Sequence, residues 1–238
     1  LGLLEEISIR LAGITGTVKN EASHTRIYVL AADNGVVSEG VSSAPQSVTR
    51  AQAINLTRGL TGASCLAKHF HDGLTVVDMG IALPYTCPEI LDRSLGKGTA
   101  NIAAGPAMPR PAAVQGILTG MERAAQARQD GIRLLGVGEM GIGNTTTSSA
   151  VLCALSGESV EAVTGRGGGL TDAAFGRKKQ VIEQALAVNR PDADDPIDVL
   201  CKGGGCDLCA MTGGFLGAAH ARLPVVVDGF ISIVAALC

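Results

Sequence analysis

Short apolar runs alternate along this chain with longer segments in which apolar residues recur every three or four positions. The apolar runs predict strands at residues 26–32, 74–79, 132–135 and 223–228. The periodic segments predict helices at residues 4–13, 45–58, 63–70, 109–128, 147–155, 171–188 and 207–221. Continuous apolar strands that alternate with helices are typical of a parallel sheet covered on both faces. We therefore predict an α/β fold with a mostly parallel, Rossmann-like doubly wound sheet and helices on both faces.

Composition narrows the functional classes. Aromatic residues make up 3% of the 238 residues and the formal net charge is −3, which argues against nucleic-acid binding. No apolar run reaches the ~18 residues that a membrane span needs. The seven cysteines are odd in number and lie mostly in apolar context, which favours a reduced cytoplasm.

The most informative stretch runs from Gly136 to Thr146, with the sequence GVGEMGIGNTT. It follows an apolar run and precedes a predicted helix. Glycines let the backbone turn sharply, and a helix start offers free N–H groups and a favourable dipole for anions. We therefore predict a phosphate site here, in preference to a glycine turn that serves packing alone. Gly136-x-Gly138-x-x-Gly141 also fits the dinucleotide fingerprint, but the acidic strand end expected ~20 residues later is missing, so NAD is only weakly indicated.

Glu139 would repel a phosphate, so we expect its carboxylate to face a sugar or a developing cation, or else to be a solvated loop carboxylate. Because ligands of such sheets bind at the carboxyl ends of the strands, we expect Asp33, residues 138–144 and Asp228 to share one edge. Lys178 lies on an apolar helical stripe, where it either extends to solvent or reaches inward to a phosphate. Gln52 is either an amide at the edge of the core or a hydrogen-bonding group on a pocket wall.

Three cysteines have a spacing that suggests a metal. Cys201-x4-Cys206-x2-Cys209 matches the first three ligands of a plant-type iron–sulfur site, but a fourth ligand is missing. For zinc, the nearest histidine is His220. Cys206 and Cys209 also fit as small buried residues of an apolar helix, and we favour that interpretation.

Several stretches resemble one enzyme family, the nicotinate-nucleotide–dimethylbenzimidazole phosphoribosyltransferases. The resemblance covers essentially the whole chain. The segments that match the family are residues 1–5, 32–36 (ADNGV), 39–42 (EGVS), 98–101, 105–108 (GPAM), 136–146 and 224–230 (PVVVDGF).

The resemblance implies an enzyme that transfers phosphoribose from nicotinate mononucleotide to 5,6-dimethylbenzimidazole or a related base. It also implies a homodimer that uses no metal or other cofactor. Residues 1–238 would form one large α/β domain, in which residues 1–15 are a helix of a second, smaller domain.

By the same resemblance, Glu139 would be the catalytic carboxylate beside the ribose and nicotinate. The nucleotide and its phosphate would be held by Gly138, Gly141, Gly143, Asn144, Thr145, Gly167 and Lys178, and the base by Gln52, Ala44, Pro45 and Met140. No metal-binding residues are implied.

The chain also departs from the family pattern. The family's general base is a glutamate in an Arg-Leu-Gly-Glu-Gly motif near the C-terminus, which these 238 residues do not contain. A nucleotide-binding paralogue or fragment without catalysis is therefore an alternative. Asn34, Ala44 and Cys206 differ from the family's usual residues, which leaves the identity of the acceptor base open.

Overall fold

The computed structural model describes residues 2–21 and 23–238, and a five-stranded sheet forms its centre. The strands are β1 Thr25–Ala32, β2 Gly73–Gly80, β3 Leu91–Asp92, β4 Leu134–Met140 and β5 Val225–Val226. The helices are α1 Leu3–Thr15, the 3₁₀ helix η1 Gly35–Glu39, α2 Ser47–Thr57, α3 Gly62–Phe70, α4 Arg110–Gln129, α5 Asn144–Ser156, α6 Val160–Val163, α7 Asp172–Asn189, α8 Pro196–Gly203, α9 Cys206–His220 and α10 Phe230–Leu237.

All strand pairs are parallel, in the order β3-β2-β1-β4-β5. This confirms the predicted parallel α/β fold. From β1 the chain builds outward through β2 and β3, and it then crosses back to place β4 and β5 on the other side of β1. The topological switch point therefore lies between β1 and β4, where ligands of doubly wound sheets bind at the carboxyl ends.

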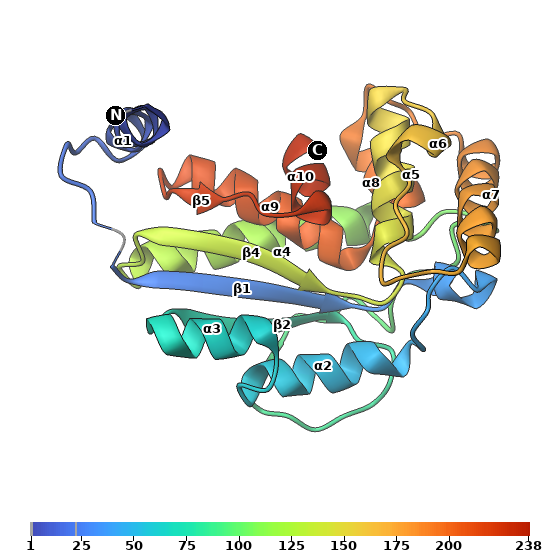
Figure 1. Cartoon of the computed structure of the whole chain (residues 1–238), viewed down its shortest axis with the longest axis horizontal. Coiled ribbons are helices and arrows are strands. Elements are labelled where there is room, and N and C mark those ends of the chain that lie inside the picture. The colour runs from blue at the N-terminus through green and yellow to red at the C-terminus, as the bar shows by residue number, and fades with distance from the viewer. Residues whose placement is uncertain (1, 22) are drawn as a thin grey trace.

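The two faces of the sheet bury separate cores (Figure 1). Along β1, Leu30 and Ala32 belong to the larger core, which includes residues of α4 and α9. Val29 and Ala31 point to the other face and pack in the smaller core with residues of α2. This alternation follows from the two-residue repeat of a strand, and it explains why β1 is apolar throughout.

Helices α4 and α9 pack backbone to backbone through glycines. A Cβ atom at Gly120 would overlap the carbonyl oxygen of Ala210, and one at Gly213 would overlap that of Ile117. Only residues without a side chain allow this approach. The contact fixes α9 along the sheet, with its first turn at the carboxyl edge where β1 and β4 end.

Three elements differ in extent from the sequence prediction. Strand β4 extends to Met140 because its ladder with β1 continues through Leu30–Glu139 and Ala31–Met140. Helix α5 begins at Asn144, three residues earlier than predicted. The last strand shrinks to Val225–Val226, because only these residues pair with β4, and the residues after it turn into α10.

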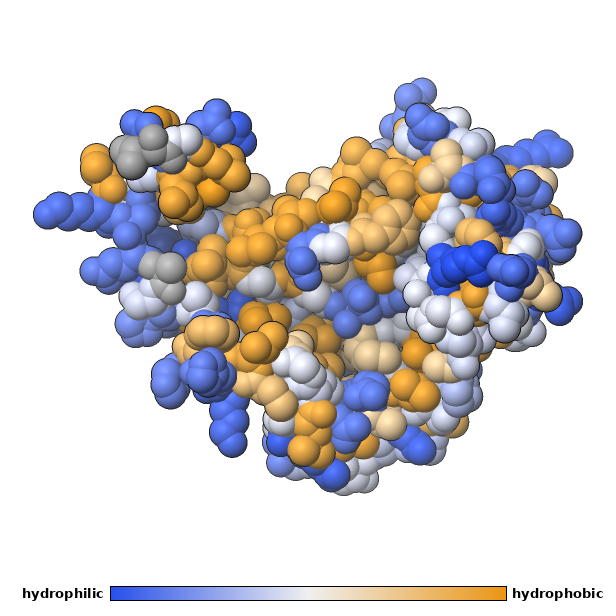
Figure 2. All heavy atoms as spheres, in the orientation of Figure 1, coloured by the Kyte–Doolittle hydropathy of each residue, from blue (hydrophilic) through white to orange (hydrophobic). Residues whose placement is uncertain are grey.

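Helix α1 lies apart from the sheet (Figure 1). None of its described residues is buried, and Leu3, Leu4 and Ile9 are mostly exposed. Apolar side chains also gather on the surface over β5 and α9 in Figure 2, where Val226, Val227 and the α10 residue Ile233 are exposed. Across residues 2–21 and 23–238, no helix combines the length and the apolar character needed to cross a bilayer.

Helix α7, which carries Lys178, depends on a side-chain cap. The Thr171 hydroxyl accepts a hydrogen bond from the Ala174 backbone N–H at 3.3 Å. We expect Thr171→Ala to lower the free energy of unfolding by about 1 kcal/mol, because one N–H at the helix start loses its acceptor. Urea unfolding measures this change. Thr171→Ser keeps the hydroxyl and is the control, so equal losses in both variants would contradict the capping role.

Candidate active site

The glycine-rich stretch forms the end of β4, a three-residue turn and the start of α5. Glu139 is paired within the strand opposite Leu30, so it is not the loop residue that the sequence predicted. Gly136 and Gly138 also lie in the strand and only Gly141 enters the turn, which removes the basis for a dinucleotide fingerprint. The turn ends at Gly143, whose φ of 93° favours glycine and directs the chain into α5.

Close packing explains the glycines of the turn. A Cβ atom at Gly141 would lie 2.5 Å from the Ala32 carbonyl oxygen and 2.6 Å from Oδ2 of Asp207. One at Gly143 would lie 2.7 Å from Cγ2 of Val37. The turn is therefore pressed against the end of β1 and the start of α9, which holds the first residues of α5 in place.

The expected shared edge is present. Asp33 follows β1 and accepts a hydrogen bond from the Ala82 backbone N–H at 2.8 Å, which ties the ends of β1 and β2 together. Asp228 follows β5 and lines the same cavity wall as Glu139. Because the sheet is parallel, the carboxyl ends of β1, β4 and β5 meet at this edge.

Glu139 takes part in a chain of polar side chains. The Asn144 amide nitrogen donates to Oε2 of Glu139 and lies 3.5 Å from Oδ2 of Asp207. Burial, with the Asp207 charge as the second cause, raises the pKa of Glu139 to about 7. Burial also raises the pKa of Asp207 to about 6. At neutral pH the two carboxyl groups together therefore carry less than two negative charges.

Lys178 reaches inward, and the alternative that it extends to solvent is wrong. Its side chain is fully buried, and its ammonium donates to the Thr145 hydroxyl and the Gly165 carbonyl, both at 2.9 Å. Among the described residues, no carboxylate forms an ion pair with it. Burial lowers the pKa of Lys178 to about 8. A buried cation without a counter-charge is suited to receive an anion beside Thr145.

A small cavity of about 120 Å³ lies at this position. It is lined by residues 141–145 from the turn and the start of α5, together with Arg166, Gly167 and Gly168 from the loop before α7 and residues 41–44 after η1. A Cβ atom at Gly167 would lie 3.0 Å from the Thr145 hydroxyl and 3.7 Å from the Lys178 ammonium. The predicted phosphate residues Gly141, Gly143, Asn144, Thr145 and Gly167 thus come together around this cavity, with Lys178 behind Thr145.

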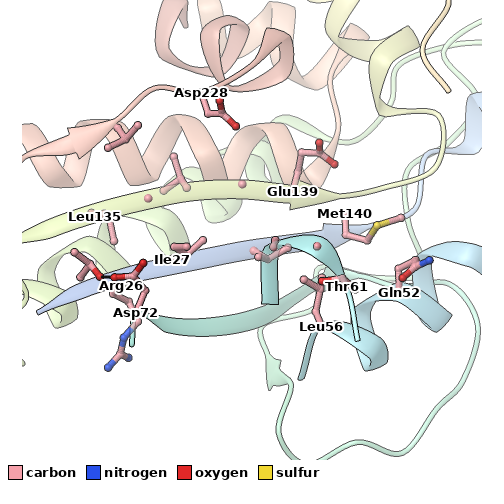
Figure 3. Close-up of a pocket in the computed structure, with 18 of the residues that line it drawn as sticks. Arg26, Ile27, Gln52, Leu56, Thr61, Asp72, Leu135, Glu139, Met140 and Asp228 are labelled. Carbon is pink, nitrogen blue, oxygen red and sulfur yellow. Dashed lines mark hydrogen bonds between the residues drawn. The ribbon is translucent and has the colours of Figure 1, made fainter. Parts of the chain in front are cut away.

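A much larger cavity of about 900 Å³ opens along β1 and β4 (Figure 3). Its lining includes Gly138, Glu139, Met140 and Asp228. Figure 3 shows Glu139 on the side of β4 that faces Asp228, whereas Met140 lies on the side of α2 with Gln52. A third cavity of about 200 Å³ shares Gly138, Glu139 and Asp228 with the large one and Thr145 with the small one. Glu139 therefore lines the large cavity and the third one, and the third one shares Thr145 with the small, glycine-walled cavity.

The predicted base-binding residues divide between these cavities. Gln52 and Met140 line the large cavity, so Gln52 is a half-buried group on a pocket wall. Ala44 lines the small cavity, and Pro45 is exposed and lines neither. The structure thus brings Gln52 and Met140 together, and it leaves Ala44 at the small cavity and Pro45 outside both.

The cysteine cluster is separate from these cavities. Cys201, Cys206 and Cys209 are buried in the larger core as free thiols. Within the part of the chain that the structure describes, no group of three or more side chains has an arrangement that could hold a metal ion. The metal hypothesis therefore has no geometric support among those residues.

Asp207 is the site residue that sequence reasoning missed. Its position in the apolar run CDLCAM suggested the first turn of an ordinary helix. The available signal was a single carboxylate, two residues after Gly205, inside a run that follows Gly203-Gly204-Gly205. A buried carboxylate needs partners, and such residues gather at functional sites.

Gly138 leaves space that a ligand can use. No atom lies within 4 Å of a Cβ atom placed there, and the residue lines both the large and the third cavity. We expect Gly138→Val to raise KM for the ligand of this cavity about 10-fold, because the new side chain occupies ligand volume. Steady-state kinetics measure KM, and thermal unfolding checks that the variant is folded. Gly105→Val, at another glycine with open space, is the control; an equal KM in the two variants would contradict the prediction.

Comparisons with known proteins identify the family of this chain. A family model described as phosphoribosyltransferase matches residues 1–238. The nicotinate-nucleotide–dimethylbenzimidazole phosphoribosyltransferase of Ruminiclostridium cellulolyticum is 48% identical over 237 residues, and that of Geobacter metallireducens is 48% identical over 238 residues. The match covers 100% of this chain and 67% of each relative, so the chain spans about two thirds of their length.

Solved structures show the same likeness. The crystal structure of CobT from Thermus thermophilus superposes with a TM-score of 0.94 at 41% identity, over 99% of this chain and 71% of that one. A structure of the nicotinate-nucleotide–dimethylbenzimidazole phosphoribosyltransferase from the same organism gives a TM-score of 0.91 at 40% identity, over 99% of this chain and 70% of that one. The chain belongs to the nicotinate-nucleotide–dimethylbenzimidazole phosphoribosyltransferase family.

Proposed function

We propose that the protein carrying this chain transfers 5-phosphoribose from nicotinate mononucleotide to 5,6-dimethylbenzimidazole or a related base. The bond between the anomeric carbon and the nicotinate nitrogen breaks, and its electron pair stays on nicotinate. A ring nitrogen of the acceptor forms the new bond with inversion, which gives α-ribazole 5′-phosphate. The other ring nitrogen of the acceptor loses its proton to water.

The observation that carries the proposal is the position of Glu139, which lines the large cavity and a third cavity that shares Thr145 with the small one. The small cavity, with the start of α5 and the buried Lys178, suits the 5′-phosphate. The large cavity has the apolar walls that suit flat aromatic bases. The ribose would then lie beside Glu139, where a carboxylate stabilises positive charge that develops at the anomeric carbon.

The roles of the side chains follow from these positions. Thr145, Gly141, Gly143 and Gly167 contact the phosphate, and Lys178 supplies its counter-charge. The Asn144 backbone lies at the same helix start, while its side chain is engaged by Glu139. Gln52 and Met140 contact a base on the large-cavity side.

Product analysis tests the proposal. The full-length protein is incubated with nicotinate mononucleotide and 5,6-dimethylbenzimidazole, and nicotinate and α-ribazole 5′-phosphate are quantified by chromatography and mass spectrometry. We expect the two products in equal amounts, and neither when the base is omitted. Binding of the nucleotide by calorimetry without any product would refute the transfer and leave a nucleotide-binding protein.

We also propose that the protein is a cytoplasmic homodimer in which residues 1–238 form one α/β domain and residues 1–15 contribute a helix to a smaller second domain. The exposed apolar side chains of α1, such as Leu4 and Ile7, are what such a domain would cover. Light scattering of the full-length protein tests the dimer, and a monomer at micromolar concentration would refute it.

A further inference from the structure

The carboxylate of Asp207 is fully enclosed by protein. The residue is 0% exposed, in the first turn of α9. Its Oδ1 accepts from the Leu208 backbone N–H at 2.9 Å. A Cβ atom at Gly141 would lie 2.6 Å from Oδ2, and one at Gly205 would overlap Oδ1. Glycines on both sides thus let the β4–α5 turn and the α8–α9 connection enclose this carboxylate.

The Asn144 amide connects Asp207 to Glu139. A primary amide nitrogen carries two N–H groups. Here the nitrogen donates to Oε2 of Glu139 and faces Oδ2 of Asp207, so each carboxylate can take one of them. With acceptors on both sides, only one orientation of the amide satisfies them, and the nitrogen must point toward Glu139. Without the Asp207 carboxylate, the Asn144 amide could rotate and point its oxygen toward Glu139.

From this geometry we propose that Asp207 is a positioning residue for the transfer. It fixes the Asn144 amide, and the amide in turn holds the Glu139 carboxyl toward the cavities. The inference rests on the proposed function, because Glu139 matters only if positive charge develops beside it. Asp207 itself is enclosed by protein and touches no cavity that Glu139 lines.

The charges around Glu139 give this link a measurable consequence. Asp207 faces it from α9 through Asn144, Asp228 lines the same cavity, and Lys178 on α7 lies behind Thr145. Asp207 is the second cause, after burial, of the raised pKa of Glu139. A change at Asp207 therefore alters the titration of Glu139, as well as its orientation, and an ordinary packing residue would not do this.

The experiment follows the Glu139 carboxyl directly. Full-length protein is labelled with ¹³C at the glutamate carboxyl carbons, and the Glu139 signal is assigned by its absence in Glu139→Gln. We expect Asp207→Asn to lower the titration midpoint of Glu139 by about one pH unit, because a like charge is removed. Asp78→Asn is the matched control, since Asp78 is also a buried carboxylate at a strand end but binds Gly80, Ile81 and Tyr85 instead.

Kinetics test the positioning. We expect Asp207→Asn to lower kcat about 10-fold with KM for nicotinate mononucleotide within about 2-fold of the wild type. If Asp207 acts through Asn144, the double variant with Asn144→Ala is no slower than Asn144→Ala alone. Effects of the two substitutions that multiply would overturn the proposal, as would an unchanged Glu139 midpoint in Asp207→Asn.

Two further outcomes are distinguishable. If Asp207→Asn fails to fold by circular dichroism, Asn144→Ala alone decides, and a kcat equal to that of the wild type would overturn the proposal. If the wild-type protein forms no α-ribazole 5′-phosphate, the proposed function fails. The carbon titration of Asp207→Asn then still shows whether Asp207 acts on Glu139.

Discussion

Replacing Glu139 with glutamine is expected to lower kcat for phosphoribosyl transfer by about 10²- to 10³-fold, the scale seen when one electrostatic contact to the transition state is removed. Glutamine has the same size, and its carbonyl oxygen can still accept the hydrogen bond from the Asn144 amide. The substitution therefore removes the negative charge beside the ribose and little else. KM for nicotinate mononucleotide, which also depends on the phosphate contacts, should change far less than kcat.

The pH dependence distinguishes this role from a structural one. With a pKa of about 7 for Glu139, wild-type kcat should rise with pH as the carboxyl ionises, and the glutamine variant should lose that rise. A steady-state profile from pH 5 to 9 measures it. Equal kcat values for the variant and the wild type would remove Glu139 from the chemistry.

As pH rises through about 7, the contribution of Glu139 to folding stability should fall while kcat rises. Because the pKa of Glu139 is higher in the folded than in the unfolded protein, the folded state holds the proton more tightly between the two values. The carboxyl's contribution to stability is complete below the unfolded pKa and is lost as pH rises through about 7. At pH 8 the glutamine variant should thus resist urea better than the wild type, and at pH 4 the two should be alike.

Local patterns in the sequence were enough to predict the α/β fold and the strand–turn–helix at residues 136–146. Apolar runs mark strands buried on both faces, and glycines mark the tight turn. The extent of β4 could not be predicted in this way, because its last three residues pair with β1 about 110 positions earlier in the chain. Glycines and a carboxylate in a strand are locally unfavourable, so tertiary pairing had to override local preference.

The candidate site could also be predicted only where local sequence patterns carry the signal. Glycines ahead of a helix and a carboxylate among them are signals carried by single residues, and they indicated Glu139 and Gly141 as candidate site residues. The direction of the Lys178 side chain depends on α7 packing against α5, and the enclosure of Asp207 depends on glycines in two separate segments. Such contacts between distant segments are decided by the packing of helices on the sheet, which no short pattern contains.

Replacing Lys178 with methionine is expected to raise KM for nicotinate mononucleotide about 10- to 100-fold, the value of a hydrogen bond to a charged group. Methionine keeps the length and the apolar stem of lysine, so it can fill the same buried channel between α7 and α5. The variant lacks the ammonium that lies beside Thr145 and the small cavity. Because the phosphate is distant from the reacting carbon, kcat at saturating nucleotide should fall much less than KM rises.

The same substitution should stabilise the free protein at neutral pH. Burial lowers the pKa of Lys178 from 10.5 to about 8. Below about pH 8 the folded protein therefore holds a buried positive charge, which destabilises it. Between about pH 8 and 10.5 the unfolded chain binds more protons, and wild-type stability should therefore rise with pH through this window. Methionine carries no charge and so removes this destabilisation at every pH, although Thr145 and Gly165 each lose a hydrogen-bond donor. We expect a net gain of about 1–2 kcal/mol at pH 7 that shrinks toward pH 10.

Urea unfolding at pH 7 and 9.5, together with nucleotide kinetics, tests both halves of this prediction. Lys179→Met is the matched control, since Lys179 is the next residue of α7 but pairs with Glu161 on the surface and lies over Phe175. It should leave KM for the nucleotide unchanged. An unaltered KM in Lys178→Met would show that the buried ammonium serves only Thr145 and Gly165. A gain in stability together with a loss of affinity would show that the fold maintains an unpaired charge there in order to bind phosphate.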